Sequence, residues 1–372
     1  MIHLLIDKST LQSLSQDEVN IMATHYWVVY APTLFVEILG DLKKISGDVE
    51  ASKKEIRKTA PKISGFQSTF SANFRFLLYA NLLGNTVESD YRPIMLGGET
   101  VVAKDGSKGI FFDEQPEYKA LRRWTEGIFT EAEELLSDSW RKSTKAIDLE
   151  LWRKHHKSFS PIRSLSELPA IVESIISNQH YQLENLRWLL SEVSFEENKK
   201  TEIFNYWLQH GMPPIKVLAP YAYYCLKVFT SFYLAAANGL IGTRPTNRVD
   251  LEYILYFPFC KVFASTDKFL KTFAPLFLGE NQEFIWGETL KEDLKKINEY
   301  WNYLSDEEKK SYRQKYGDYP PEIANSITSA LWEKMCYHRE EAVGNPEITP
   351  EREKEIMDRM RPMLEAIDKI RQ

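Results

Sequence analysis

The chain has 372 residues, 43% of them hydrophobic, which is enough for one large domain or two ordinary ones. Its formal net charge of −6 argues against a protein that coats nucleic acid, but not against an enzyme that touches a few phosphates through a local patch. A charged fraction of 27% with this hydrophobic content is not typical of a disordered chain.

Cysteine usage and hydropathy indicate a cytoplasmic protein. Cys225, Cys260 and Cys336 are far apart and show no CxxC spacing, which favours reduced thiols over a disulfide or zinc framework. No signal peptide is expected, because Asp7 interrupts the first apolar run too early. The most apolar stretch, 217–241, contains a proline and a lysine, so we expect a buried helix and no membrane contact.

The first 45 residues alternate between strand and helix patterns. Apolar runs at 2–6 and 26–30 predict two buried strands. Apolar residues at helical spacing predict one helix over 9–24, and Pro32 suits the first turn of a second helix. This β-α-β-α order is typical of a parallel sheet covered by helices.

The next part of the chain, 46–212, is charged or amphipathic and predicts a mainly helical insertion. Long helices are expected near 118–141 and 168–193. Short β-type runs within 91–112 are punctuated by glycines and predict a hairpin or an irregular flap.

The α/β pattern returns at about residue 213. An apolar helix is expected over 219–240, followed by a Gly-Pro-rich bend and a short helix over 249–256. A buried strand is expected over 261–264. The chain then turns polar, and 279–372 predicts a helical C-terminal extension.

Four carboxylates occupy matching places in these elements. Asp7 ends the first strand, Glu37 lies in the second helix, Asp250 opens the short helix and Asp267 ends the last strand. The carboxyl ends of parallel strands share one edge of a sheet, so we expect the four to converge there. Close carboxylates repel unless a cation joins them, and Mg²⁺ or Mn²⁺ prefers oxygen ligands. A pair of such ions roughly 3.5–4 Å apart suits phosphodiester hydrolysis.

Each acid also has a purely structural explanation. Asp7 and Asp250 could cap the helices that follow them, because Asp is a good N-cap. Asp267 could close a turn, and Glu37 could face solvent. Only the convergence of all four acids favours a catalytic metal site over these structural roles.

The segments around the four acids resemble, in order, the motifs of PIN-domain nucleases. Residues 4–9 have that family's hydrophobic strand, Asp and small hydroxylic residue, and 28–39 look like its second strand and Glu-bearing helix. Residues 248–255 are similar to its third acidic position. Residues 262–269 look like its final strand, in which Ser265 replaces the usual Thr and keeps the hydroxyl.

The resemblance implies a metal-dependent endonuclease with a PIN-like parallel sheet flanked by helices. Asp7, Glu37, Asp250 and Asp267 would be both the catalytic residues and the ligands of Mg²⁺ or Mn²⁺. The resemblance alone favours RNA over DNA as the substrate.

The expected organisation is a nuclease core formed by 1–45 and 213–278, a helical insertion at 46–212 and the extension at 279–372. Ordinary family members are much shorter between the second and third acids, so the insertion could cover, select or block the site. An insertion of this size suggests that the protein is regulated. It could be a toxin or a phage-defence effector that is controlled by a regulatory protein partner or by homo-oligomerisation.

Two basic stretches, 42–62 and 140–163, each carry seven Lys or Arg residues, and aromatic residues interleave with the second. They could form a phosphate-tracking surface with stacking aromatics, or they could be ordinary solvated helix faces. The aromatic content is also open to two interpretations: the 9 Trp, 19 Tyr and 20 Phe residues could fill the core, or some of them could stack on bases.

Five residues beside the acids could assist the site. Ser9 and Ser265 are candidates to orient a carboxylate or water. Lys8 and Lys268 could contact phosphate or lie on the surface. Asp41, at i+4 from Glu37, could be a fifth acid or the partner of a nearby lysine.

Two other function classes remain open. The chain could be a non-catalytic PIN-like scaffold or nucleic-acid-binding protein that acts through its insertion and C-terminal helices. Phosphatase-type chemistry fits a leading Asp after a strand, but it lacks a second Asp two residues later, where Ser9 stands.

Overall fold

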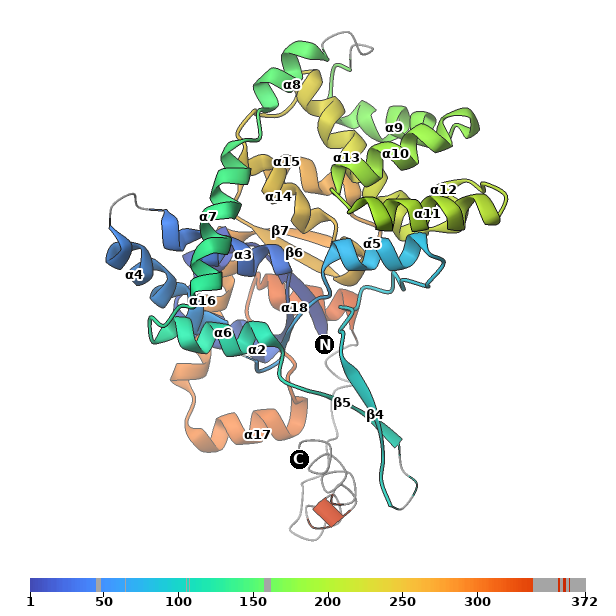
Figure 1. Cartoon of the computed structure of the whole chain (residues 1–372). Coiled ribbons are helices and arrows are strands. Elements are labelled where there is room, and N and C mark those ends of the chain that lie inside the picture. The colour runs from blue at the N-terminus through green and yellow to red at the C-terminus, as the bar shows by residue number, and fades with distance from the viewer. Residues whose placement is uncertain are drawn as a thin grey trace.

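A five-stranded parallel sheet lies at the centre of the computed structural model (Figure 1). Its strands, in spatial order, are β3 (Ser68–Phe70), β2 (Tyr26–Tyr30), β1 (Ile2–Ile6), β6 (Val262–Ser265) and β7 (Glu283–Trp286). The structure describes residues 1–44, 48–63, 65–104, 106, 108–156, 162–336, 354, 357–358 and 361.

β1 is the middle strand and is apolar on both faces, with Ile2, Leu4, Leu5 and Ile6 fully buried. It pairs in parallel with β2 on one side and with β6 on the other. The chain runs from β1 outward through β2 to β3, and it later returns to β6 and runs outward to β7. The topological switch point therefore lies between β1 and β6. In open α/β sheets, ligands bind at the carboxyl ends of the strands at this point.

Helices cover the sheet on both sides. In Figure 1, α13 (Pro220–Ala237), α14 (Thr246–Ile254) and α15 (Lys268–Phe273) lie above the sheet, and α2 (Gln16–His25), α16 (Gly287–Tyr303) and α18 (Ile327–Met335) lie below it. One cluster of buried apolar side chains includes residues from the predicted core, insertion and extension alike.

The remaining helices belong mainly to the predicted insertion. Among them, α4 (Val49–Thr59), α5 (Phe74–Leu82), α8 (Leu149–His155) and α11 (Glu197–Gln209) lie in the insertion; α3 (Pro32–Gly40) and α12 (Ile215–Leu218) lie in the predicted core, and α17 (Asp306–Tyr316) lies in the extension. The predicted hairpin is confirmed as β4 (Gly98–Val102) and β5 (Lys108–Phe112), an antiparallel pair. Among the described residues, no helix is both long and apolar enough to cross a membrane.

The helix predicted over 9–24 is two helices, α1 (Lys8–Ser13) and α2. Ser15 ends the first and caps the second, because its hydroxyl accepts from the Glu18 N–H and the Glu18 carboxylate accepts from the Ser15 N–H. This Ser-x-x-Glu capping box is visible in the sequence.

The helices predicted near 118–141 and 168–193 are also divided. The first becomes α6 (Pro116–Thr125) and α7 (Glu131–Lys145), separated at Gly127, whose φ of +78° favours glycine. The second becomes α9 (Leu168–Ile176) and α10 (Gln182–Glu192).

The two outer strands of the sheet were missed by the sequence patterns. β3 lies within the predicted insertion, and β7 lies within the predicted extension. The central sheet therefore extends beyond the segments 1–45 and 213–278. Most of the extension after Cys336 lies outside the described residues.

Candidate active site

Asp7 follows β1 directly and is buried, with 3% of its surface exposed. Its Oδ1 accepts a hydrogen bond from the Thr10 N–H at 2.8 Å, so it caps α1. Its Oδ2 accepts from the hydroxyls of Ser9 at 2.6 Å and Ser265 at 2.7 Å. Burial raises the pKa of the Asp7 carboxyl, and these hydrogen bonds oppose that effect. Asp7 is thus both a helix cap and a buried, oriented carboxylate.

Asp267 occupies the equivalent place after β6. Its Oδ1 accepts from the N–H groups of Phe269 at 2.7 Å and Leu270 at 3.1 Å, which caps α15. Its Oδ2 lies 3.7 Å from the exposed guanidinium of Arg244. The Ser265 hydroxyl accepts from the Asp267 N–H at 2.9 Å while it donates to the first acid of the site. One serine therefore links the ends of the two strands at the switch point.

Glu37 lies in α3 and points toward α14. Its Oε2 accepts from the Tyr253 hydroxyl at 2.5 Å. Burial raises the pKa of Glu37 to about 7, the charges of Asp7 and Asp41 add to the rise, and Lys8 and Tyr253 oppose it.

Asp250 lies in the middle of α14, so the prediction that it opens this helix was wrong. Its Oδ2 is buried and has no hydrogen-bond partner among the residues that the structure describes. Burial raises the pKa of Asp250 to about 9, the negative charges of Glu37, Asp267 and Asp7 add to the rise, and Arg244 opposes it.

The structure thus brings the four predicted acids to one edge of the sheet, where they influence one another electrostatically. Within the described part of the chain, however, no three His, Cys, Asp or Glu side chains approach closely enough to hold a metal ion. The donor chemistry suits a hard divalent cation, since all four side chains offer carboxylate oxygens and one of these oxygens is buried without a partner. The arrangement is a convergence of acids rather than a complete coordination sphere.

A buried ion pair holds α14 in place. The guanidinium of Arg248 contacts Glu192 of α10 at 2.7 Å and Glu252 at 3.4 Å. The second oxygen of Glu252 accepts from the Thr33 hydroxyl of α3 at 2.9 Å. The insertion helix α10 is therefore connected to the two helices that carry Asp250 and the site's glutamate.

The auxiliary residues divide into two groups. Ser9 and Ser265 do hydrogen-bond the first acid, as predicted. Asp41 is an ion-pair partner, because its carboxylate lies 2.6 Å from Lys8 and 3.3 Å from Arg141. Lys8 is therefore engaged with Asp41 and is not an open phosphate contact, whereas Lys268 is exposed.

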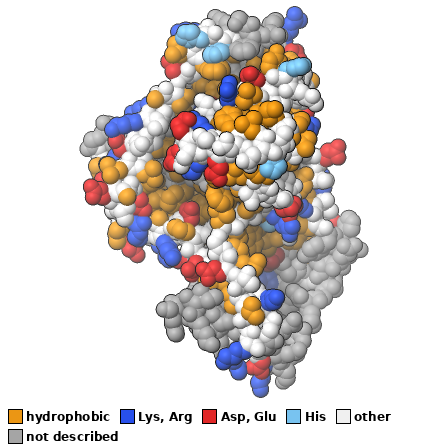
Figure 2. Space-filling view, turned by 45° about the vertical axis from the view of Figure 1, so that its right-hand side comes forward, with side chains coloured by type: hydrophobic (Ala, Val, Ile, Leu, Met, Phe, Trp, Pro, Cys, Tyr) orange, Lys and Arg blue, Asp and Glu red, His pale blue; other side chains and the backbone are white. Residues whose placement is uncertain are grey.

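The two basic stretches are largely occupied by other interactions. Lys62 donates to three backbone carbonyls at the end of α1, and Arg153 donates to one carbonyl in the last turn of α13 and to one just after that helix. Other members pair with acids: Lys43, Lys44, Lys53, Lys58, Arg141 and Lys142. On the face in Figure 2, basic side chains stand among acidic ones. Lys157 and Phe159 lie outside the described residues.

Sequence patterns missed two residues of the site, Tyr253 and Arg244. Tyr253 lies three residues after Asp250 in α14, a spacing that places both on one helix face and could have identified it. Arg244 belongs to the Gly-Pro-rich bend, and only the fold places it beside Asp267.

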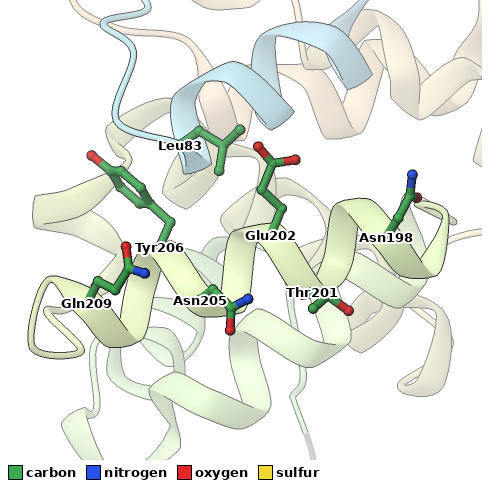
Figure 3. Close-up of a pocket in the computed structure, with 7 residues that line it drawn as sticks. All are labelled: Leu83, Asn198, Thr201, Glu202, Asn205, Tyr206 and Gln209. Carbon is green, nitrogen blue, oxygen red and sulfur yellow. The ribbon is translucent and has the colours of Figure 1, made fainter.

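A separate hollow of about 560 Å³ lies between α11 and the end of α5 (Figure 3). Its lining is mostly polar and comes from Leu83, Asn198, Thr201, Glu202, Asn205, Tyr206 and Gln209. All of these residues belong to the insertion.

Comparisons with family models, curated proteins and solved structures found no match for this chain.

Proposed function

We propose that this protein is a metal-dependent endonuclease with a PIN-like core that hydrolyses phosphodiester bonds, with RNA favoured over DNA. The observation that supports it is the convergence of four acids at the switch point, with one buried oxygen of Asp250 unpartnered. Asp7, Glu37, Asp250 and Asp267 would hold Mg²⁺ or Mn²⁺. When bound, the ion lowers the pKa of the attacking water and stabilises the charge on the leaving 3′ oxygen.

The chain's own residues prepare the site for this reaction. Ser9 and Ser265 hold the Asp7 carboxylate in one orientation, and the N-terminus of α15 holds Asp267. The Tyr253 hydroxyl donates to Glu37 and holds its carboxylate on the side of α3 that faces α14. Attack of water on phosphorus breaks the P–O3′ bond, and the leaving oxygen takes up a proton to give a 3′-hydroxyl and a 5′-phosphate.

The test is cleavage of structured and single-stranded RNA by the purified chain in Mn²⁺. We expect Asp7→Asn and Asp250→Asn to lose at least about 100-fold in rate, because each removes a charged ligand next to the reacting phosphate. Asp17→Asn is the control, because Asp17 is an exposed carboxylate of α2. Activity that persists in both site variants would reject the assignment.

A second function is favoured by a different observation. The described acids do not come within metal-binding distance in groups of three, and six Lys or Arg residues of the two basic stretches pair with acids. A non-catalytic scaffold that acts through the insertion and C-terminal helices would have these properties. Such a scaffold needs no divalent ion, so Mn²⁺ would not change its thermal stability.

A further inference from the structure

Trp286 stands at the same sheet edge as the acids. It is the last residue of β7, and the strand register pairs it with Ser265 of β6. The Ser265 hydroxyl donates to Asp7, so Trp286 lies beside the residue that orients this carboxylate, with only β6 between β7 and β1. The tryptophan is half-buried, because α16 begins immediately after it at the fully buried Gly287.

Close packing at Gly287 determines where the indole stands. A Cβ at this position would lie 2.5 Å from the Thr266 side chain and 2.9 Å from the Thr10 hydroxyl. The backbone after β7 is therefore pressed against the elements that carry Asp7 and Asp267. The indole N–H donates to the Glu288 carboxylate at 3.0 Å, which holds one edge of the ring.

Cationic side chains flank this tryptophan. The Lys271 ammonium lies 4.3 Å from the centre of the Trp286 ring, the shortest cation–π contact among the described residues. Lys268 is one turn earlier in α15, and both lysines are exposed. Arg244, whose side chain is 68% exposed, lies 3.7 Å from the Asp267 carboxylate that caps α15.

Proteins that bind single-stranded nucleic acids combine an aromatic ring with exposed cations, because bases stack on the ring and phosphates pair with the cations. The acids nearby repel phosphates in the absence of a cation, which explains why the basic groups lie at the rim. The alternative is a purely structural role, in which Trp286 covers the edge of the sheet and packs against Lys271.

We propose that Trp286 is a stacking platform for one base of a single-stranded substrate, with Lys271 and Lys268 contacting the adjacent phosphates. Lys271 leaves the ring when the base stacks and pairs with the backbone. The neighbouring phosphodiester then lies next to the acidic cluster. This inference rests on the proposed function, because it assumes that nucleic acid is the substrate.

The test measures binding separately from cleavage. Fluorescence anisotropy with a labelled 12-nucleotide oligoadenylate RNA is recorded in EDTA, using the full chain with Asp250→Asn so that no cleavage occurs. We expect Trp286→Ala to weaken binding about 10-fold, since stacking on an aromatic ring contributes roughly 1–3 kcal/mol per base. Trp286→Phe keeps an aromatic face and should stay within about 3-fold.

Two further arms exclude a merely structural effect. Lys271→Ala should lower the salt dependence of binding by about one phosphate contact. Lys315→Ala, at the cation–π pair with Tyr316 in α17, should leave it unchanged. An oligonucleotide with abasic positions should bind the Trp286 protein as weakly as Trp286→Ala binds the intact strand.

Each outcome bears on one claim. The platform is overturned if Trp286→Ala binds the strand as tightly as the parent protein does. It is also overturned if Trp286→Phe and Trp286→Ala lose the same affinity, or if the parent protein does not bind the strand. Cleavage by the protein with native Asp250 in Mn²⁺ is scored separately. A platform that binds in a protein that never cleaves would support the binding site and reject the nuclease.

Discussion

At the carboxyl edge of the sheet, Asp7 and Asp267 serve local structure and the candidate site together. Each caps the helix after its strand with Oδ1, and each keeps Oδ2 directed elsewhere, toward two serine hydroxyls or toward Arg244. The capping and functional interpretations of these residues are therefore compatible, because a carboxylate has several acceptor sites.

Replacing Asp250 with Asn should stabilise the metal-free protein at high pH. The folded-state pKa of Asp250 is raised from 3.8 to about 9, so ionisation costs stability progressively as the pH rises through this window. The neutral amide removes that cost. We expect Asp250→Asn to gain roughly 1–3 kcal/mol in free energy of unfolding at pH 8 and almost nothing at pH 4.

Urea denaturation in EDTA from pH 4 to 9 measures this difference. Asp306→Asn serves as the control, because the Asp306 side chain is 98% exposed in α17. If the free energies of unfolding of Asp250→Asn and the parent protein changed with pH in parallel, ionisation of Asp250 would not cost stability.

Tyr253→Phe should destabilise the protein more at pH 8 than at pH 5. The Tyr253 hydroxyl donates to Glu37, and this hydrogen bond lowers the pKa of a carboxyl that burial raises to about 7. Its loss raises that pKa further, so the penalty grows as Glu37 ionises. We expect a loss of about 1–3 kcal/mol at pH 8, the usual cost of removing a donor from a buried charged group.

Tyr224→Phe provides a matched control, because Tyr224 of α13 also donates to α14. Tyr224 donates to the neutral carbonyl of Ile254 at 2.7 Å, so its removal should cost the same at both pH values. A pH-independent loss in Tyr253→Phe as well would contradict the proposed support of Glu37.

At the scale of elements, the C-terminal end of helix α1 is held by distant parts of the chain. Asp7 caps its N-terminus. At its C-terminus the Lys62 ammonium donates to the carbonyls of Leu11, Gln12 and Leu14, and Lys291 donates to that of Ser13 at 2.5 Å. The two lysines come from the predicted insertion and extension. A helix of only six residues needs such partners for its terminal carbonyls.

Lys62→Met should lower the free energy of unfolding by about 1.5–3 kcal/mol, because it leaves several carbonyls without their charged donor. Chemical denaturation measures the loss, and exposed Lys54→Met on α4 is the control. Repulsion from Lys291 helps to lower the pKa of Lys62, second to its burial. The double variant with Lys291→Met should therefore deviate from additivity. Equal stability of Lys62→Met and Lys54→Met would show that the contacts contribute nothing.

For the whole molecule, the acidic cluster exists only because strands from both ends of the sequence pair in one sheet. Mn²⁺ binding to this cluster would stabilise the folded chain by mass action, by about 2.7 kcal/mol at an ion concentration 100 times Kd. We expect a rise in melting temperature with Mn²⁺ that Asp7→Asn and Asp250→Asn abolish and Asp17→Asn preserves. A melting temperature that does not change when Mn²⁺ is added would favour the non-catalytic scaffold.

Sequence patterns predicted β1, β2, β6, the hairpin, the positions of Asp7 and Asp267 after their strands, and the helix that carries Glu37. These features depend on local patterns, namely apolar runs and residues that end them. The division of the 9–24 helix was also local, since Ser15 and Glu18 form a capping box. The short strands β3 and β7 were not predictable in this way, because three or four residues carry too little periodicity and their pairing comes from the sheet.

The surroundings of the acids depend on the tertiary structure. It placed Ser265 between Asp7 and Asp267, the Tyr253 hydroxyl on Glu37, and Trp286 one strand away. It also removed Lys8 from the candidate phosphate contacts by pairing it with an acid. The Ser265–Asp7 and Tyr253–Glu37 partners lie 258 and 216 residues apart in the chain. Burial and charge at such contacts depend on the packing of whole elements, which no local pattern encodes.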